Sequence, residues 1–190
     1  MDPQAAVLQR EPDIPVHLGE LTALGLPGAS YDAIALNHVI EHVPDPVALV
    51  AECRRLLSPG GVLVVVTPNL DSTGHRLFGD GWRGLEPPRH LHLFTAHTLA
   101  SLAQRSGFNT FGTWTTAAKA ETFSAGSVHQ NASRGHPATA HTVLTDMGFQ
   151  LRAWMRWLKA RDSGEECVLM ATRATSDSDP EPVAMDGSAR

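Results

Sequence analysis

The sequence predicts an α/β fold in which a mainly parallel sheet is covered by helices on both faces. Residues 33–36 and 62–66 are continuous apolar runs of strand length, and a helical pattern separates them. Apolar strands that alternate with helices are typical of parallel sheets buried between helix layers. A further apolar run at residues 167–172 predicts an antiparallel strand that closes the sheet near the C-terminus.

The predicted N-terminal elements are short. Asp2 and Pro3 suit an N-cap and the first position of a helix, which we expect over residues 4–10. A brief strand is expected at residues 16–18, and the proline and glycine of residues 26–30 indicate a turn. The run at residues 33–36 then forms the next strand.

Two later helices have clear N-terminal caps. Asp45 and Pro46 begin the first, whose apolar residues recur at helical spacing at Leu49, Val50, Cys53, Leu56 and Leu57. The glycines at 60 and 61 end this helix before the strand at residues 62–66. Thr95 caps the second helix, which ends at Gly107 and is expected to bury Leu99, Leu102 and Ala103.

The C-terminal third is less regular. A partly exposed strand is expected at residues 108–116, followed by a polar loop or insertion at residues 117–141. An amphipathic helix begins near Leu144, with an apolar stripe at Leu144, Met147, Leu151, Trp154, Met155 and Leu158. The stripe favours docking of this helix against its own domain, and contact with a membrane surface or cover over a hydrophobic acceptor are the alternatives.

Length and composition indicate one domain. We expect it to span residues 1–173, with residues 117–160 as an insertion or lid and residues 174–190 as a disordered tail. The net charge of −5 and the pI near 6.0 disfavour nucleic-acid binding. No apolar run is long enough for a transmembrane segment, so we expect a cytoplasmic protein in which Cys53 and Cys167 are buried free thiols.

Three segments carry a family resemblance. Residues 37–43 (Asn-His-Val-Ile-Glu-His-Val) directly follow a predicted strand, residues 58–69 form a glycine turn and strand, and residues 88–95 form a Pro-Arg-His-Leu-His-Leu-Phe-Thr loop. Together they resemble class I S-adenosylmethionine-dependent methyltransferases, in the branch related to ubiquinone-biosynthesis methyltransferases. The resemblance implies a Rossmann-like sheet, S-adenosyl-L-methionine as cofactor, and methyl transfer to oxygen or nitrogen of a small-molecule acceptor.

The family's N-terminal glycine-rich cofactor turn has no counterpart in this sequence. We therefore expect an N-terminally incomplete version of the domain. The alternative is an inactive methyltransferase-like scaffold or a partner-dependent fragment, in which a dimer or a partner chain covers the sheet edge that the first strand would occupy.

The resemblance also implies site residues, because parallel strands hold their ligands beyond their carboxyl ends. Cofactor contacts fall on Glu20, Leu21, Asn37 and His38. The candidate proton acceptors are His42, His90 and His92, since a hydroxyl acceptor must lose a proton. Glu41, Trp82 and Arg83 are expected to bind the acceptor. We expect Glu20, Asn37 and His42 to border one hollow.

A rival pattern overlaps the same residues. His38-Val39-Ile40-Glu41-His42 matches the His-x-x-Glu-His motif of inverted zinc proteases. Those enzymes carry the motif inside a long helix, whereas here it follows a strand and is followed closely by Pro44 and Pro46. Zinc-dependent hydrolysis by His38, Glu41 and His42 is therefore the minor alternative, and no metal is expected.

Overall fold

The computed structural model describes residues 15–118, 120–133 and 143–175. Its sheet has four strands in the order β1-β2-β4-β3: β1 (Tyr31–Asn37), β2 (Leu57–Pro68), β4 (Glu166–Thr172) and β3 (Thr110–Thr116). β1 and β2 are parallel, while β4 runs antiparallel to both β2 and β3. The predicted parallel pair and the closing antiparallel strand are thus confirmed. The helix expected at residues 4–10 and most of the expected tail lie outside the described residues.

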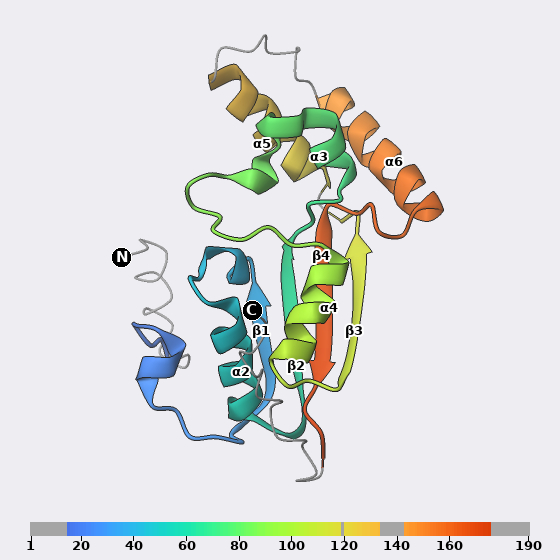
Figure 1. The fold of residues 1–190 in the computed structure, drawn as a ribbon. Helices are drawn as coiled ribbons and strands as arrows, with labels where there is room; N and C mark the ends of the chain where they lie inside the picture. Colours follow the sequence, from blue (N-terminus) through green and yellow to red (C-terminus); the bar gives the residue numbers. More distant parts are fainter. Residues whose placement is uncertain (1–14, 119, 134–142, 176–190) are drawn as a thin grey trace, which may run out of the picture.

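The helices form two groups. α2 (Pro46–Leu56) and α4 (Ala96–Arg105) lie on one face of the sheet, while α3 (Thr73–Phe78), α5 (Ala120–Ser133) and α6 (Val143–Lys159) gather beyond the carboxyl ends of β1 and β2 (Figure 1). We call the second group the helical cap. Four short 3-10 turns connect the larger elements: η1 (Leu21–Leu24), η2 (Ile40–His42), η3 (Gly79–Gly81) and η4 (Arg83–Leu85).

The main core lies between the sheet and the pair α2 and α4. Alternate residues of β2 and β4 face it, among them Leu63, Val65 and Leu169, all fully buried. Most helix residues expected to face inward are buried: Val50, Cys53, Leu56, Leu99, Leu102 and Ala103. Leu49 is partly buried against the core, and Leu57, expected in the helix, is instead the first residue of β2, so the helix ends before the glycines at 60 and 61. On the opposite face of the sheet, Trp114 and Met170 are about half exposed. Cys53 and Cys167 are buried and free, as predicted.

The predicted caps set where both core helices begin. Asp45 accepts a hydrogen bond of 3.0 Å from the backbone N–H of Ala48, and Pro46 occupies the first turn. Thr95 and Thr98 form a reciprocal capping box at the start of α4. These bonds satisfy backbone donors that have no partner inside a helix.

Two segments have a different secondary structure from the one predicted. Residues 16–18 form no strand, because no neighbouring strand lies beside them among the described residues, so β1 is the sheet edge. Residues 120–133, within the expected loop at 117–141, form helix α5. This helix carries no long apolar stripe, and it is held by a few buried contacts, chiefly Ala120 and Phe123. Such a helix depends on packing that a local pattern does not reveal.

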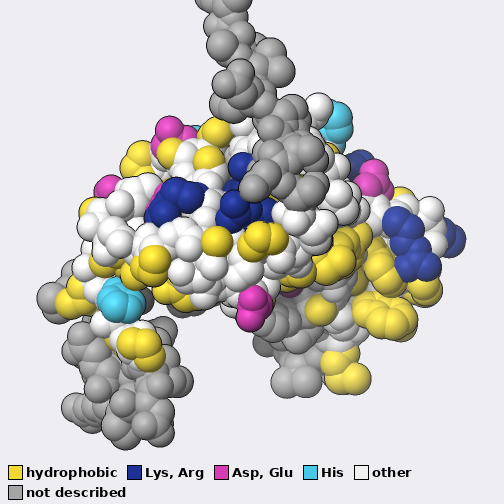
Figure 2. Space-filling view, turned by 90° about the horizontal axis from the view of Figure 1, so that it is seen from below, with side chains coloured by type: hydrophobic (Ala, Val, Ile, Leu, Met, Phe, Trp, Pro, Cys, Tyr) yellow, Lys and Arg dark blue, Asp and Glu magenta, His cyan; other side chains and the backbone are white. Residues whose placement is uncertain are grey.

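Helix α6 is amphipathic as predicted, but it docks through a different face. Phe149 and Ala153 pack into a small cluster with Ala120, while the stripe residues Met147, Leu151, Trp154, Met155 and Leu158 are at least half exposed. Seen from below, hydrophobic side chains lie on the surface beside Lys and Arg side chains at the edge where α6 projects (Figure 2). None of the described helices is long and apolar enough to cross a membrane.

The core predicts a clear stability difference between two leucines. Leu99→Ala should lower the free energy of unfolding by about 2–5 kcal/mol, because it removes a fully buried side chain from α4. Leu77→Ala, at a position that is 54% exposed, should change it by less than about 0.5 kcal/mol. Urea unfolding followed by circular dichroism measures both. Equal losses in the two variants would contradict the described core.

Candidate active site

A cavity of about 350 Å³ lies between the sheet and the helical cap, beyond the ends of β1 and β2. Its walls come from the residue after β1, from η2, from the end of β2, from η4 and the loop after it, from α5, and from the start of β4. The lining residues are His38, Glu41, His42, Pro68, Arg83, Gly84, Glu86, Arg89, His90, Thr122, Phe123 and Glu166.

His38 joins three segments at the edge of the cavity. It follows β1 directly with a left-handed backbone (φ +52°), and its N–H still bonds the carbonyl of Val66 at 2.9 Å. Its ring nitrogens contact Glu41 at 3.2 Å and Glu166 at 2.9 Å. Hydrogen bonds to Glu166 and then to Glu41 raise the pKa of His38 to about 9. The side chain is therefore an imidazolium at neutral pH.

Glu41 is a buried carboxylate with every oxygen engaged. Burial alone would raise its pKa, but hydrogen bonds from His38, from its own backbone and from the Thr67 hydroxyl (2.9 Å) lower the pKa of Glu41 below its usual value. Its backbone carbonyl accepts bonds from the N–H groups of Leu91 and His92 at 2.7 and 3.2 Å. Glu41 thus holds the loop of residues 88–95 against η2.

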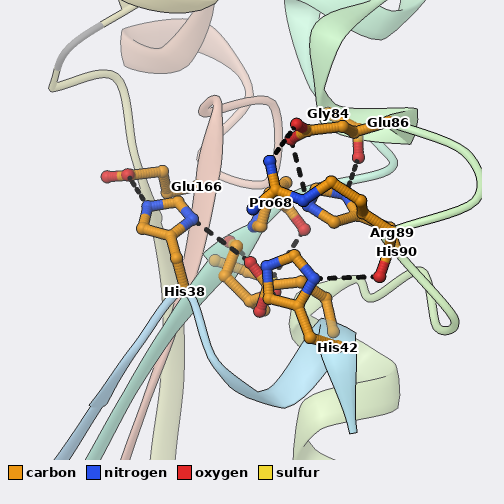
Figure 3. A network of polar contacts seen from close by, with 11 residues as sticks. His38, His42, Pro68, Gly84, Glu86, Arg89, His90 and Glu166 are labelled. Atoms are coloured by element: carbon orange, nitrogen blue, oxygen red, sulfur yellow. Dashed lines mark hydrogen bonds and ion pairs between the residues drawn. The ribbon is translucent and has the colours of Figure 1, made fainter. Parts of the chain in front are cut away.

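Two histidines from different segments meet beside Glu41. The rings of His42, from η2, and His90, from the loop after η4, lie edge to face with their centroids 4.7 Å apart (Figure 3). Nδ1 of His42 lies 2.9 Å from the carbonyl of Arg89, and Nδ1 of His90 lies 2.7 Å from the carbonyl of Gly84. A carbonyl only accepts, so each Nδ1 carries a proton. In the neutral rings, each Nε2 therefore has a free lone pair.

The outer wall carries a second charged group. Glu86 has an unusual backbone with φ +28° and pairs with Arg89 at 2.6 Å. Its other oxygen lies 3.6 Å from Nε2 of His90. Figure 3 shows these side chains above His42, on the side of the helical cap. The cavity is consequently polar and holds both carboxylates and cations.

Arg83, in η4, lines the cavity and contacts helix α5 of the helical cap. The backbone N–H of Arg83 bonds the hydroxyl of Ser127 on α5 at 2.9 Å. Its side chain passes so close to Gly126 that a Cβ there would lie 2.1 Å from Arg83 Cδ. Gly126 thus gives Arg83 the space to pass α5 and line the cavity.

A buried acid lies behind the cavity. Glu165 is fully buried, and its Oε1 accepts a 2.7 Å hydrogen bond from the N–H of Gly74. Its Oε2 and the Nε1 of Trp82 lie against Gly74, and neither has a hydrogen-bond partner. Burial, only partly offset by the bond from Gly74, raises the pKa of Glu165 to about 7.

The structure brings together some of the predicted site residues. His38, Glu41, His42, Arg83 and His90 all line the cavity. Trp82 is fully buried and stacks on Phe123, so it supports the wall from behind. His92 lies outside the lining, with Nε2 3.3 Å from the carbonyl of Pro44.

The residues predicted to contact the cofactor do not all lie at the cavity. Asn37 ends β1 with an exposed side chain, directly before His38. Glu20 and Leu21 begin η1, which contacts α2 rather than the cavity. Of Glu20, Asn37 and His42, only His42 is among the lining residues. Because residues 15–20 pair with no strand, nothing aligns their turn with the ends of β1 and β2.

Glu166 is the main site residue that the sequence reasoning missed. Two consecutive acidic residues, Glu165 and Glu166, directly precede the apolar run of β4. Since β4 is antiparallel to β2, its first residue lies where β2 ends, and Glu166 is paired with Pro68. The acids before a closing strand were therefore an available signal.

The His-x-x-Glu-His run does not form the helical geometry of an inverted zinc protease. It covers the residue after β1 and a single 3-10 turn of three residues. Both ring nitrogens of His38 contact carboxylates. Among the described residues, three possible metal-ligand atoms within 4.8 Å of one another come from Glu41, His42 and His90.

Comparisons with known proteins show the family of this chain. The sequence pattern of a methyltransferase domain matches residues 2–111. A probable S-adenosylmethionine-dependent methyltransferase of Mycolicibacterium smegmatis is 38% identical over 104 residues, covering 55% of this chain and 38% of that protein. A ubiquinone biosynthesis O-methyltransferase of Xylella fastidiosa is 56% identical over 41 residues, covering 22% and 17%. The chain thus matches less than two fifths of the length of these relatives.

The fold also matches solved structures. A crystal structure of an S-adenosylmethionine-dependent methyltransferase from Thermotoga maritima superposes with a TM-score of 0.57 over 90% of this chain and 69% of that one. The identity is 20%, so this match concerns the fold alone.

The His38 bridge predicts a pH-dependent stability. The folded pKa near 9 exceeds the unfolded value of 6.5, so this stabilisation is complete below pH 6.5 and is lost as the pH rises through 9. Because a third of the side chain is exposed, we expect a loss of about 1–2 kcal/mol. In His38→Gln this fall should be absent, and in the exposed control His97→Gln it should persist. Urea titrations between pH 6 and 9.5 measure it.

The raised pKa of Glu165 predicts a second loss of stability, which occurs as the pH rises from about 4.5 to about 7. Between its unfolded pKa of 4.5 and its folded pKa near 7, the folded state holds a proton that the unfolded state has released. The free energy of unfolding should therefore fall across this window, by about 2 kcal/mol. Relative to the native protein, Glu165→Gln should gain that amount between pH 4.5 and 8, whereas the exposed Glu20→Gln should not. Thermal unfolding at several pH values tests this, and parallel curves for all three proteins would contradict it.

Proposed function

The chain belongs to the methyltransferase-domain family, and we propose that it transfers a methyl group from S-adenosylmethionine to an oxygen or nitrogen of a small-molecule acceptor. The observation that carries this proposal is the pair His42 and His90, which line a polar cavity at the ends of parallel strands, each with Nδ1 turned to a backbone carbonyl. Ligands of open α/β sheets bind at such strand ends.

The described residues fit the cofactor in part. Members of the family use S-adenosylmethionine, whose sulfonium supplies an activated methyl group. Asn37 ends β1 and His38 follows it, at the rim where the cofactor is expected, and we assign cofactor contacts to them. Glu20 and Leu21 lie beside α2, and their cofactor role stays a prediction.

The cavity is suited to a small polar acceptor. Its volume of about 350 Å³ lies at the lower end of the range of small-molecule sites. Arg83 and Arg89 offer N–H donors, and Glu86 and Glu166 offer carboxylate oxygens. Methyl transfer requires an acceptor atom held in line with the methyl group, and we propose that these side chains orient it.

Transfer to a hydroxyl also needs a proton acceptor. We propose His42 for this role, because its Nδ1–H is fixed on the carbonyl of Arg89 and its Nε2 is free to take a proton. His90 supports the same ring from the side and is the second choice. His92 is the least suited of the three predicted histidines, since it lies outside the cavity.

Methyl transfer by purified protein tests the proposal. With S-adenosylmethionine carrying a labelled methyl group and a panel of phenols, alcohols and amines, we expect transfer to at least one acceptor class. His42→Gln should lower kcat for a hydroxyl acceptor about 10²- to 10⁴-fold at nearly constant KM. His92→Gln should stay within about threefold of the native rate, because its ring does not face the acceptor.

The exposed variant His97→Gln is the matched control for histidine replacement. Loss of activity in His92→Gln with full activity in His42→Gln would contradict the assigned roles. Calorimetric titration with S-adenosylmethionine addresses the scaffold alternative. Binding weaker than about 1 mM, with no transfer to any acceptor, would favour an inactive scaffold or a fragment that needs a partner.

A further inference from the structure

We propose that Glu41, His42 and His90 form a binding site for a divalent transition-metal ion such as Zn²⁺. One carboxylate oxygen and two imidazole nitrogens of these residues all lie within 4.8 Å of one another. Two imidazoles and a carboxylate are a ligand set that zinc and ferrous ions adopt in proteins. The three ligands come from η2 and from the loop before α4, so an ion would join these two segments.

The distances require only small side-chain movements. Ligand atoms around one zinc ion lie about 3–3.5 Å apart, since each is about 2.0–2.2 Å from the metal. Rotations that move the ring atoms by about 1 Å bring the set to that spacing. The edge-to-face contact of the His42 and His90 rings, with centroids 4.7 Å apart, already brings the two ligands together.

The surroundings of the ligands are a stronger argument than their proximity. Metal-binding histidines typically donate their second ring N–H to a carbonyl or a carboxylate, which fixes the tautomer and the ring orientation. His42 and His90 both do so, to the carbonyls of Arg89 and Gly84. In this tautomer each Nε2 can offer its lone pair to a metal, and an ion at His90 would replace the contact of its Nε2 with Glu86 at 3.6 Å.

The carboxylate is oriented in the same way. Oε1 of Glu41 contacts Nδ1 of His38 and Oε2 accepts from the Thr67 hydroxyl, and each oxygen keeps a further lone pair. Glu41 is therefore held in place by groups that are not ligands themselves. All three proposed ligands have such supporting partners, as in established metal sites.

This site differs from the rejected zinc-protease pattern. His38 is a supporting residue here, and His90, which lies 48 residues beyond His42 in the sequence, takes the place of a ligand. An ion at this point would lie in the wall of the cavity, with coordination positions open toward it. With an ion bound, Nε2 of His42 would be a ligand, so His42 would act as the proton acceptor only in the metal-free protein. The ion would instead lower the pKa of an acceptor hydroxyl that it contacts, and the released proton would pass to water.

Metal binding is measured without any turnover, so its outcome is independent of the methyl-transfer proposal. Tag-free protein is treated with a chelator, loaded with Zn²⁺ or Co²⁺, and passed over a desalting column. We expect about one tightly held ion per chain by elemental analysis, with a Kd below about 10 μM. The Co²⁺ form should show visible absorption bands of nitrogen and oxygen ligation.

Variants separate this site from the other histidines of the chain. His42→Gln and His90→Gln should each weaken binding more than about tenfold and alter the Co²⁺ spectrum. His97→Gln should leave both unchanged, and thermal unfolding checks that each variant is folded. Binding that persists unchanged in the double variant His42→Gln/His90→Gln, or no retained ion in the native protein, would overturn the proposal.

Discussion

The ionic bridge from His38 to Glu41 and Glu166 holds the site together. It joins the residue after β1, the turn η2 and the first residue of β4, which are far apart in the sequence. Burial of the two carboxylates imposes a desolvation cost, which their pairing with His38 and the hydrogen bond from the Thr67 hydroxyl to Glu41 offset. Glu41 in turn fixes the loop that carries His90. The candidate catalytic histidines therefore depend on this bridge for their position.

The topology of the sheet explains why these groups meet. The parallel pair β1 and β2 ends at one rim, and the antiparallel strand β4 begins at the same rim. Side chains after β1 and at the start of β4 thus converge, and Phe123 of the helical cap and Arg83 of η4 cover them. The sheet supplies the fixed half of the cavity, and the cap supplies the rest. The family and the fold are those of methyltransferases, and the acceptor proposed for this protein would be selected by the polar groups of the cavity.

Much of the fold could be predicted because its signals are local. Apolar runs gave β1, β2 and β4, and the caps at Asp45 and Thr95 gave the starts of α2 and α4. The strand at residues 16–18 failed because a strand needs a neighbour, which no local pattern supplies. Helix α5 was missed because its stability comes from a few tertiary contacts. In the site, His42 and His90 were named from a resemblance. The contact of His38 with Glu166 depends on strand direction, and the position of His90 depends on a loop that Glu41 holds.

The close passage of Arg83 across Gly126 limits how this protein can diverge. Any side chain at position 126 would collide with the aliphatic part of Arg83. A lineage that replaces this glycine must also shorten or redirect the arginine, and so must reshape the cavity that we propose for the acceptor. Changes in acceptor preference and changes on the inner side of α5 are therefore expected to be inherited together, even though the two positions are 43 residues apart in the sequence.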